Sequence, residues 1–153
     1  MRNALFLIAA MLPSIAYAQN SVTVKSEIFV VRTVTDAAGK SKRTLVDPVQ
    51  VLPGERLAVI LSYTNPAPKP ATSFVINNPV NKSIAFTGTD EAWAVVSVDG
   101  GKTFGPLATL KVTGADGKPR PAIPADVDSI RWKFAQPIAA GASGKVAFLG
   151  VVK

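Results

Sequence analysis

The sequence contains no cysteine and no histidine. Without cysteine, the chain has no disulfide and no thiolate for catalysis or metal binding. Without histidine, it lacks the side chain that acts most often as a general base near neutral pH and as a metal ligand. The chain therefore lacks the residues on which the commonest catalytic sites depend. They predict a non-catalytic protein that is stabilised by packing and has no cofactor.

Long apolar runs are also scarce, and the clearest one lies at the N-terminus. Arg2 is followed by an apolar run over residues 4–15 and then by Ala16-Tyr17-Ala18. This is the pattern of a secretory signal peptide, and the run is shorter than the ~20 residues of a membrane-spanning helix. We therefore predict a signal peptide over residues 1–18 and one exported domain, periplasmic or extracellular, over residues 19–153, with no membrane span after cleavage.

Acidic residues are outnumbered, with 10 Asp and Glu against 17 Lys and Arg. Removal of Arg2 with the signal peptide leaves a net charge of about +6. The lysines are spread from Lys25 to Lys153 without a run, which is typical of a solvated surface. An anionic envelope partner, such as a polysaccharide or lipid headgroups, is the alternative interpretation. Export and the small aromatic content, 7% of residues, argue against nucleic-acid binding.

Short runs rich in Val, Ile and Thr recur between clusters of Gly, Pro, Asn and Asp, and helical periodicity is almost absent. This pattern predicts an all-β fold. Seven to nine strands at this spacing favour an immunoglobulin-like β-sandwich of two antiparallel sheets, with a small barrel as the alternative. The expected strands cover residues 21–34, 43–51, 56–65, 72–78, 82–88, 93–98, 109–113, 129–135 and 144–152, with a long loop over residues 114–126.

Three proline-containing segments refine this arrangement. Pro48 cannot donate to a strand ladder, so it favours an edge or a bulge in the second strand. Pro53 and Gly54 are suited to a type II turn before the third strand, which is apolar on both faces and is therefore placed centrally. The proline-rich residues 66–71 are expected to be stiff and extended, and to carry the chain from one sheet to the other.

Residues 97–104, "SVDGGKTF", match the Asp-box pattern Ser-x-Asp-x-Gly-x-Thr-aromatic that is familiar from sialidases and other propellers. The matching residues are Ser97, Asp99, Gly101, Thr103 and Phe104. Their polar groups can hydrogen-bond within the turn, and the ring can anchor the hairpin on the core. The motif occurs once, and the chain is too short for a propeller of four blades. We therefore interpret it as a structural turn.

Other acidic residues offer weaker candidates for chemistry. Two pairs, Asp126 with Asp128 and Asp90 with Glu91, could act together as glycosidase carboxylates across a cleft. The same residues, with Asp99 and Asp116, could supply oxygen ligands to calcium. No dense calcium-binding loop motif is present, so isolated carboxylates in turns, with no metal, are the expected arrangement.

The two tryptophans have two interpretations. They could form an exposed platform for stacking sugars, or they could belong to the core. Trp93 opens an apolar run, and Trp132 alternates with Ile130 and Phe134 on one strand face. We therefore expect both tryptophans in the core.

Four segments together resemble a known family: "VLPGERLAVILSYTN", "SVDGGKTF", "IRWKF" and "PIAAGASGKVAF". Their order and spacing resemble the conserved-repeat domain of unknown function of bacterial envelope and surface proteins, over residues 24–152. That family shows a Pro-Gly turn before a Tyr-bearing strand ending in Asn, and a Gly-rich turn before the last strand. The resemblance implies a β-sandwich and no catalytic residues, although family members are usually repeated within long proteins and this chain has one copy.

Three functions are weighed on this basis. The leading hypothesis is an exported non-catalytic module that binds an envelope protein or polysaccharide, or supports an assembly. A second hypothesis is a self-assembling subunit whose N-terminal residues 19–30 add a strand to a neighbouring copy. A third is a small carbohydrate-active hydrolase that uses Asp99.

Overall fold

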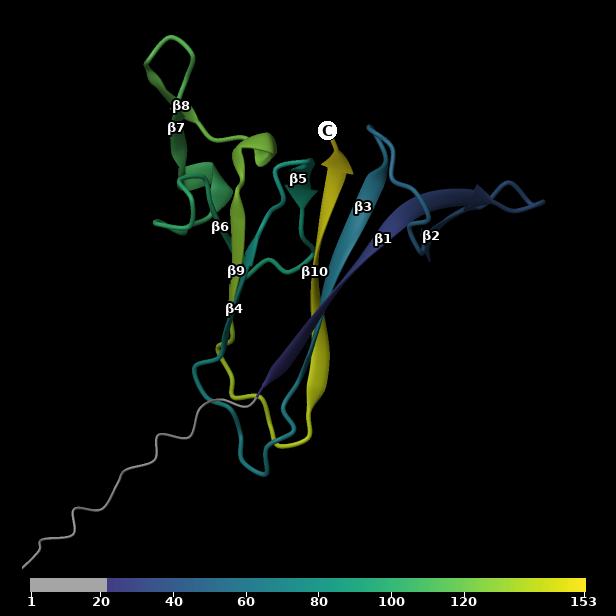
Figure 1. The fold of residues 1–153 in the computed structure, drawn as a ribbon, viewed down its shortest axis with the longest axis vertical. Helices are drawn as coiled ribbons and strands as arrows, with labels where there is room; N and C mark the ends of the chain where they lie inside the picture. Colours follow the sequence, from purple (N-terminus) through teal and green to yellow (C-terminus); the bar gives the residue numbers. More distant parts are fainter. Residues whose placement is uncertain (1–21) are drawn as a thin grey trace, which may run out of the picture.

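The structure, a computed structural model, describes residues 22–153 and contains ten strands and two short 3₁₀-helices (Figure 1). The described residues include no α-helix, and the predicted all-β class is confirmed. The predicted signal peptide lies outside the described residues. The elements are β1 (Thr23–Thr35), β2 (Ser41–Val46), β3 (Arg56–Thr64), β4 (Val75–Pro79), β5 (Ile84–Gly88), β6 (Val95–Ser97), η1 (Leu107–Thr109), β7 (Lys111–Thr113), β8 (Pro119–Pro121), η2 (Pro124–Asp126), β9 (Ser129–Lys133) and β10 (Ser143–Val152).

The strands form two antiparallel sheets and one separate hairpin. The larger sheet has the order β2-β1-β3-β10-β5, the smaller sheet has the order β4-β9-β6, and β7 pairs with β8. The chain changes sheet between β3 and β4, as the proline-rich segment predicts, and again at each step to β5 and β6. In an immunoglobulin constant domain the first and last strands belong to different sheets. Here β1 and β10 both belong to the five-stranded sheet.

The inner faces of the two sheets enclose one hydrophobic core. In β3, Leu57, Val59 and Leu61 alternate inward and are buried. In β9, Ile130 and Trp132 are fully buried, which confirms the prediction for Trp132. Each large apolar side chain that is buried in this way contributes roughly 1.5–3 kcal/mol. The strand β3 lies between β1 and β10, so its predicted central position is also confirmed.

The turn before β3 forms as the sequence predicts. Gly54 has a φ of 87°, and the N–H of Glu55 donates to the carbonyl of Leu52 at 3.1 Å. The Glu55 carboxylate accepts from the N–H of Leu52 at 2.9 Å and from the Arg32 guanidinium at 3.3 Å. The N–H of Gly54 donates to the carbonyl of Val152 at 2.9 Å. The turn therefore continues the pairing with β10 beyond the end of β3.

Asn65 joins the two chain segments that cross between the sheets at one end of the molecule. It is fully buried, and its side-chain amide donates to the carbonyls of Lys69 and Ile138 at 2.9 Å and of Ala139 at 3.2 Å. Its main-chain N–H donates to the carbonyl of Ala142 at 2.8 Å. One side chain thus fixes the β3–β4 crossover against the β9–β10 crossover.

The structure has ten strands, whereas the sequence predicts seven to nine, and two segments differ most from their predictions. The sequence predicts a second strand over residues 43–51, but β2 ends at Val46, because Pro48 cannot donate to a ladder and the chain must reach the turn at residues 52–55. The sequence predicts a loop over residues 114–126, but this segment contains β8. Gly117, with a φ of 76°, closes the β7–β8 hairpin. The two prolines of β8 lack N–H groups and conceal this strand in the sequence.

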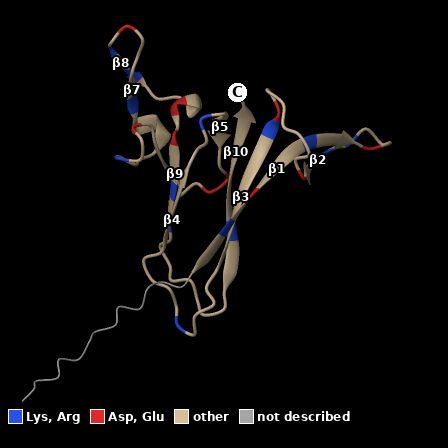
Figure 2. Cartoon of the chain, viewed as in Figure 1, with Lys and Arg blue, Asp and Glu red and all other residues tan. Residues whose placement is uncertain are grey.

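The β1–β2 hairpin leaves the body of the molecule (Figure 1). Up to Val30, β1 pairs with β3, and from Val30 onward it pairs with β2. We call residues 31–52, which include the distal half of β1, β2 and the return to β3, the arm. Basic residues lie on both sheets and on both projecting hairpins (Figure 2). None of the helices within residues 22–153 is long and apolar enough to cross a bilayer.

Replacing Asn65 with Ala is expected to lower the free energy of unfolding by about 2–4 kcal/mol, because three carbonyls at the crossovers lose a buried donor. Urea denaturation monitored by tryptophan fluorescence measures the change. Asn78→Ala is the control, since its side-chain amide makes a single hydrogen bond to the neighbouring Pro79 carbonyl. Equal losses in both variants would contradict the role assigned to Asn65.

Candidate functional site

The Asp-box turn, residues 97–104, is closed by hydrogen bonds among its own residues. The Ser97 hydroxyl donates to Asp99 Oδ1 at 2.8 Å and accepts from the Gly101 N–H at 2.9 Å. Asp99 Oδ1 accepts from the Thr103 N–H at 3.0 Å, and Asp99 Oδ2 accepts from the Thr103 hydroxyl at 2.6 Å. Both carboxylate oxygens are therefore engaged within the turn.

Contacts with β9 and the residue before it hold this turn on the smaller sheet. Gly100 and Gly101 adopt φ values of 77° and 79°, which side-chain-bearing residues rarely adopt. The N–H of Gly100 donates to Asp128 Oδ2 at 2.6 Å. The Arg131 guanidinium lies over the Phe104 ring, 3.7 Å from its centroid, in a cation–π contact. The motif residues thus come together as one hydrogen-bonded turn with its ring against β9.

The electrostatics of Asp99 follow from its donors. Hydrogen bonds from the Thr103 side chain and main chain and from the Ser97 hydroxyl hold the pKa of Asp99 well below its ordinary value. At neutral pH the carboxylate is ionised, so it has no proton to deliver as a general acid. In this geometry it acts as an acceptor that organises the turn.

The two carboxylates Asp126 and Asp128 have separate partners. Asp126 forms a two-pronged ion pair with Arg120, with both N–O distances at 2.7 Å, and also accepts from the Ile123 N–H. The hydrogen bonds from Arg120 and from Ile123 lower the pKa of Asp126. Asp128 instead binds Gly100 in the Asp-box turn. The structure therefore does not bring this pair together as a shared acid–base site.

The remaining acidic candidates do not form a shared site: Asp90 is exposed, and Glu91 and Asp116 each have hydrogen-bond partners of their own. Glu91 accepts hydrogen bonds from the Thr89 hydroxyl and from the N–H of Ala147. Its carboxylate thus binds the main chain of β10 at a position where a neighbouring strand would otherwise pair. Asp116 accepts from the Lys118 N–H within the β7–β8 turn. In residues 22–153, no three acidic side chains gather in a way that could hold a metal ion.

The expectation that Trp93 belongs to the core is wrong. The residue is 46% exposed, because it lies in a turn before β6 and not on the strand. The ring packs edge-on against Phe134, with centroids 5.1 Å apart, and Phe134 in turn contacts Tyr63 at 4.9 Å. The two tryptophans do not form a common sugar-stacking platform, since Trp132 is buried.

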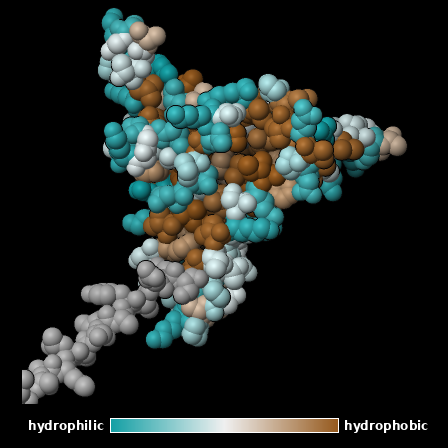
Figure 3. Space-filling model, in the orientation of Figure 1, coloured by the Kyte–Doolittle hydropathy of each residue, from teal (hydrophilic) through white to brown (hydrophobic). Residues whose placement is uncertain are grey.

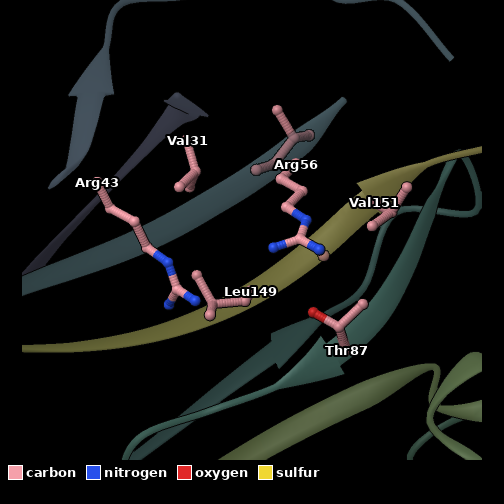
Figure 4. Close-up of a pocket in the computed structure, with 8 residues that line it drawn as sticks. Val31, Arg43, Arg56, Thr87, Leu149 and Val151 are labelled. Carbon is pink, nitrogen blue, oxygen red and sulfur yellow. The ribbon is translucent and has the colours of Figure 1, made fainter. Parts of the chain in front are cut away.

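A groove of about 260 Å³ lies on the outer face of the five-stranded sheet, and every strand of that sheet contributes to its lining (Figure 4). The groove forms where the arm departs from β3. Its lining combines two kinds of side chain. The polar groups come from Arg43, Arg56 and Thr87, and the apolar side chains on this face come from Val31, Leu149 and Val151.

Sequence reasoning missed this groove. Its residues are spread from position 31 to position 151, so no local motif links them. The available signal was the register: Val31, Leu149 and Val151 alternate with core-facing residues, and so they point to the opposite face of the sheet. That signal becomes readable only once the strand order is known.

Comparisons with protein-family models, with curated proteins and with solved structures found no significant match to this chain.

Replacing Asp99 with Asn is expected to destabilise the protein at neutral pH, because an NH₂ group would replace one of the carboxylate oxygens that accept from Ser97 and Thr103. The lowered pKa of Asp99 means that its ionised form stabilises the folded state above the ordinary carboxyl pKa of about 4, and that this stabilisation declines as the pH falls below that value. The difference in Tm between wild type and variant should therefore be smaller at a pH of about 3 than at a pH of about 7.

Thermal unfolding followed by circular dichroism at both pH values measures this difference. Asp90→Asn, at an exposed position outside the turn, is the matched control and should leave Tm nearly unchanged. A Tm for Asp99→Asn equal to that of wild type at neutral pH would refute the bracing role.

Proposed function

We propose that the protein is an exported, non-catalytic module, in the periplasm or outside the cell, that binds an envelope protein through its arm. In this proposal the two sheets are a variant of the immunoglobulin-like sandwich and serve as a scaffold. The resemblance to conserved-repeat envelope domains enters only as a hypothesis, because no family model matches the chain.

The observation that carries the proposal is the exposure of apolar side chains on the arm. Eleven large hydrophobic residues are exposed in the described part of the chain, and six of them belong to this short segment. Hydrophobic atoms are visible over the five-stranded sheet and toward the arm (Figure 3). The six residues are Val34, Leu45, Val46, Val49, Val51 and Leu52.

The pairing of the arm supports the same conclusion. Beyond Val30, β1 is paired with β2 and no longer with β3. A two-stranded ribbon without a covered apolar face is only marginally stable in water. The exposed side chains lie on both faces of the ribbon, because Leu45 is opposite Val31 and Val46 is opposite Val30. Gathered exposed apolar surface is a mark of interaction sites. An apolar protein surface that packs on the arm would bury these side chains, which a polysaccharide would do less well.

Replacing Leu45, Val49 and Leu52 together with Thr is expected to abolish capture of the partner from an envelope extract while leaving the fold intact, because all three side chains are exposed. The matched control replaces Val24, Val75 and Ile123, which are exposed outside the arm, with Thr. A protein captured by wild type and control but lost with the arm variant is the expected result. Equal capture by all three, or recovery of free monomer only, would contradict the proposal.

Self-assembly by strand addition is a second candidate, favoured by the open edge of β1. Residues 23–29 pair with β3 on one side, and β2 pairs with β1 only from Val30 onward. In the structure this segment completes the sheet of its own chain. Exchange between copies would place the same segment, in the same register, against β3 of a neighbour.

The absence of cysteine makes this candidate easy to test. Lys25 and Ser62 are opposite each other on β1 and β3. Oxidation of the Lys25→Cys/Ser62→Cys variant should give covalent dimers on non-reducing gels if the strand is exchanged, whereas a disulfide-linked monomer would rule out exchange. Each single-cysteine variant controls for nonspecific crosslinking.

A further inference from the structure

Two guanidinium groups in the groove lack an anionic partner. The ion pairs among residues 22–153 join Lys25 to Glu27, Arg32 to Glu55 and Arg120 to Asp126. Arg43 and Arg56 take part in none of them, and no hydrogen bond of either side chain is found within the described residues. Figure 4 shows both side chains extending over the outer face of the sheet toward Leu149.

The acidic residue next to Arg56 in the sequence has other partners. Glu55 precedes Arg56, and its carboxylate is engaged by Arg32 and by the N–H of Leu52. Two positive charges that share one groove repel each other, and an anion placed between them would replace this repulsion with attraction. Arginine also offers a planar fork that binds carboxylate and phosphate groups through two parallel hydrogen bonds.

The rest of the groove is suited to an apolar body. Val31, Leu149 and Val151 line it with apolar side chains, and the Thr87 side chain lies at its far side (Figure 4). The volume of about 260 Å³ corresponds to roughly nine water molecules at ~30 Å³ each. A ligand of this size is a small molecule, with about ten non-hydrogen atoms.

We propose that this groove binds a small amphiphilic anion, with a carboxylate or phosphate group between Arg43 and Arg56 and a short apolar chain over Leu149 and Val151. The groove shares Val31 and Arg43 with the arm. Its proposed role is nevertheless distinct from the protein-binding role of the arm, because it uses the outer face of the sheet and needs no partner protein. The shared chemistry is an anionic head on an apolar tail, whether the head is a fatty-acid carboxylate or a lipid-type phosphate.

Titration of the isotopically labelled protein with octanoate and with octyl phosphate, followed by NMR, tests the proposal. The amide signals of Val31, Thr87 and Leu149 should shift with at least one of the two ligands, and the ligand that binds more tightly identifies the head group. Arg43→Gln and Arg56→Gln should each weaken binding about tenfold, since each removes a charge-assisted hydrogen-bonding partner. Lys42→Gln, which removes the same charge from the residue next to Arg43, should leave binding unchanged.

Two further ligands test the contributions of the apolar tail and of the anionic head to binding separately. Octanol has the tail without the charge, and acetate has the charge without the tail, so both should bind more weakly than octanoate. The proposal is overturned if neither octanoate nor octyl phosphate shifts the groove signals, or if octanol binds as well as octanoate. Equal weakening by Lys42→Gln and the arginine variants would also overturn it, because the effect would then reflect net charge alone.

Discussion

The hydrogen bonds of Asn65 are the constraint on which the two-sheet arrangement depends. The chain passes between the sheets at both crossovers near this residue, and no disulfide can hold them together because the chain has no cysteine. A buried amide that donates to carbonyls from both crossovers satisfies polar main-chain groups that would otherwise be costly to bury. The end of the core at the β3–β4 and β9–β10 crossovers is closed in this way.

At the other end of the larger sheet, the strands diverge. Pairing of β1 with β3 stops at Val30 and Leu57, and β1 continues with β2 alone. The same divergence produces both surfaces to which we assign functions, since it projects the arm into solvent and opens the groove beside Arg56. Sheet edges are usually protected by charge or by cover. Here the edge strand β2 carries Lys42 and Arg43 and also the exposed Leu45 and Val46. These exposed apolar side chains are the reason for assigning the arm a partner.

Local features of the fold could be predicted from the sequence, and nonlocal features could not. The Pro-Gly turn at residues 52–55 follows from the conformational preferences of proline and glycine. The inward orientation of Trp132 follows from strand periodicity. The prediction for Trp93 failed because β6 begins after this residue. The strand β8 was not predicted because its two prolines lack N–H groups. The strand order, and with it the groove, depends on pairings between residues far apart in the chain, such as Leu149 with Ala58. No local pattern encodes these pairings.

The polar groups of the molecule are divided between two different tasks. In the Asp-box turn, the donors and acceptors satisfy one another, and Asp99 has both oxygens engaged. In the groove, Arg43 and Arg56 have no acceptor among the described residues. A network whose hydrogen-bond donors and acceptors are all paired stabilises a turn but leaves little capacity to bind a ligand. Unpaired charges beside an apolar surface retain that capacity. The most recognisable motif of the sequence therefore forms a hydrogen-bonded turn, and the binding site that we propose lies among residues that no motif connects.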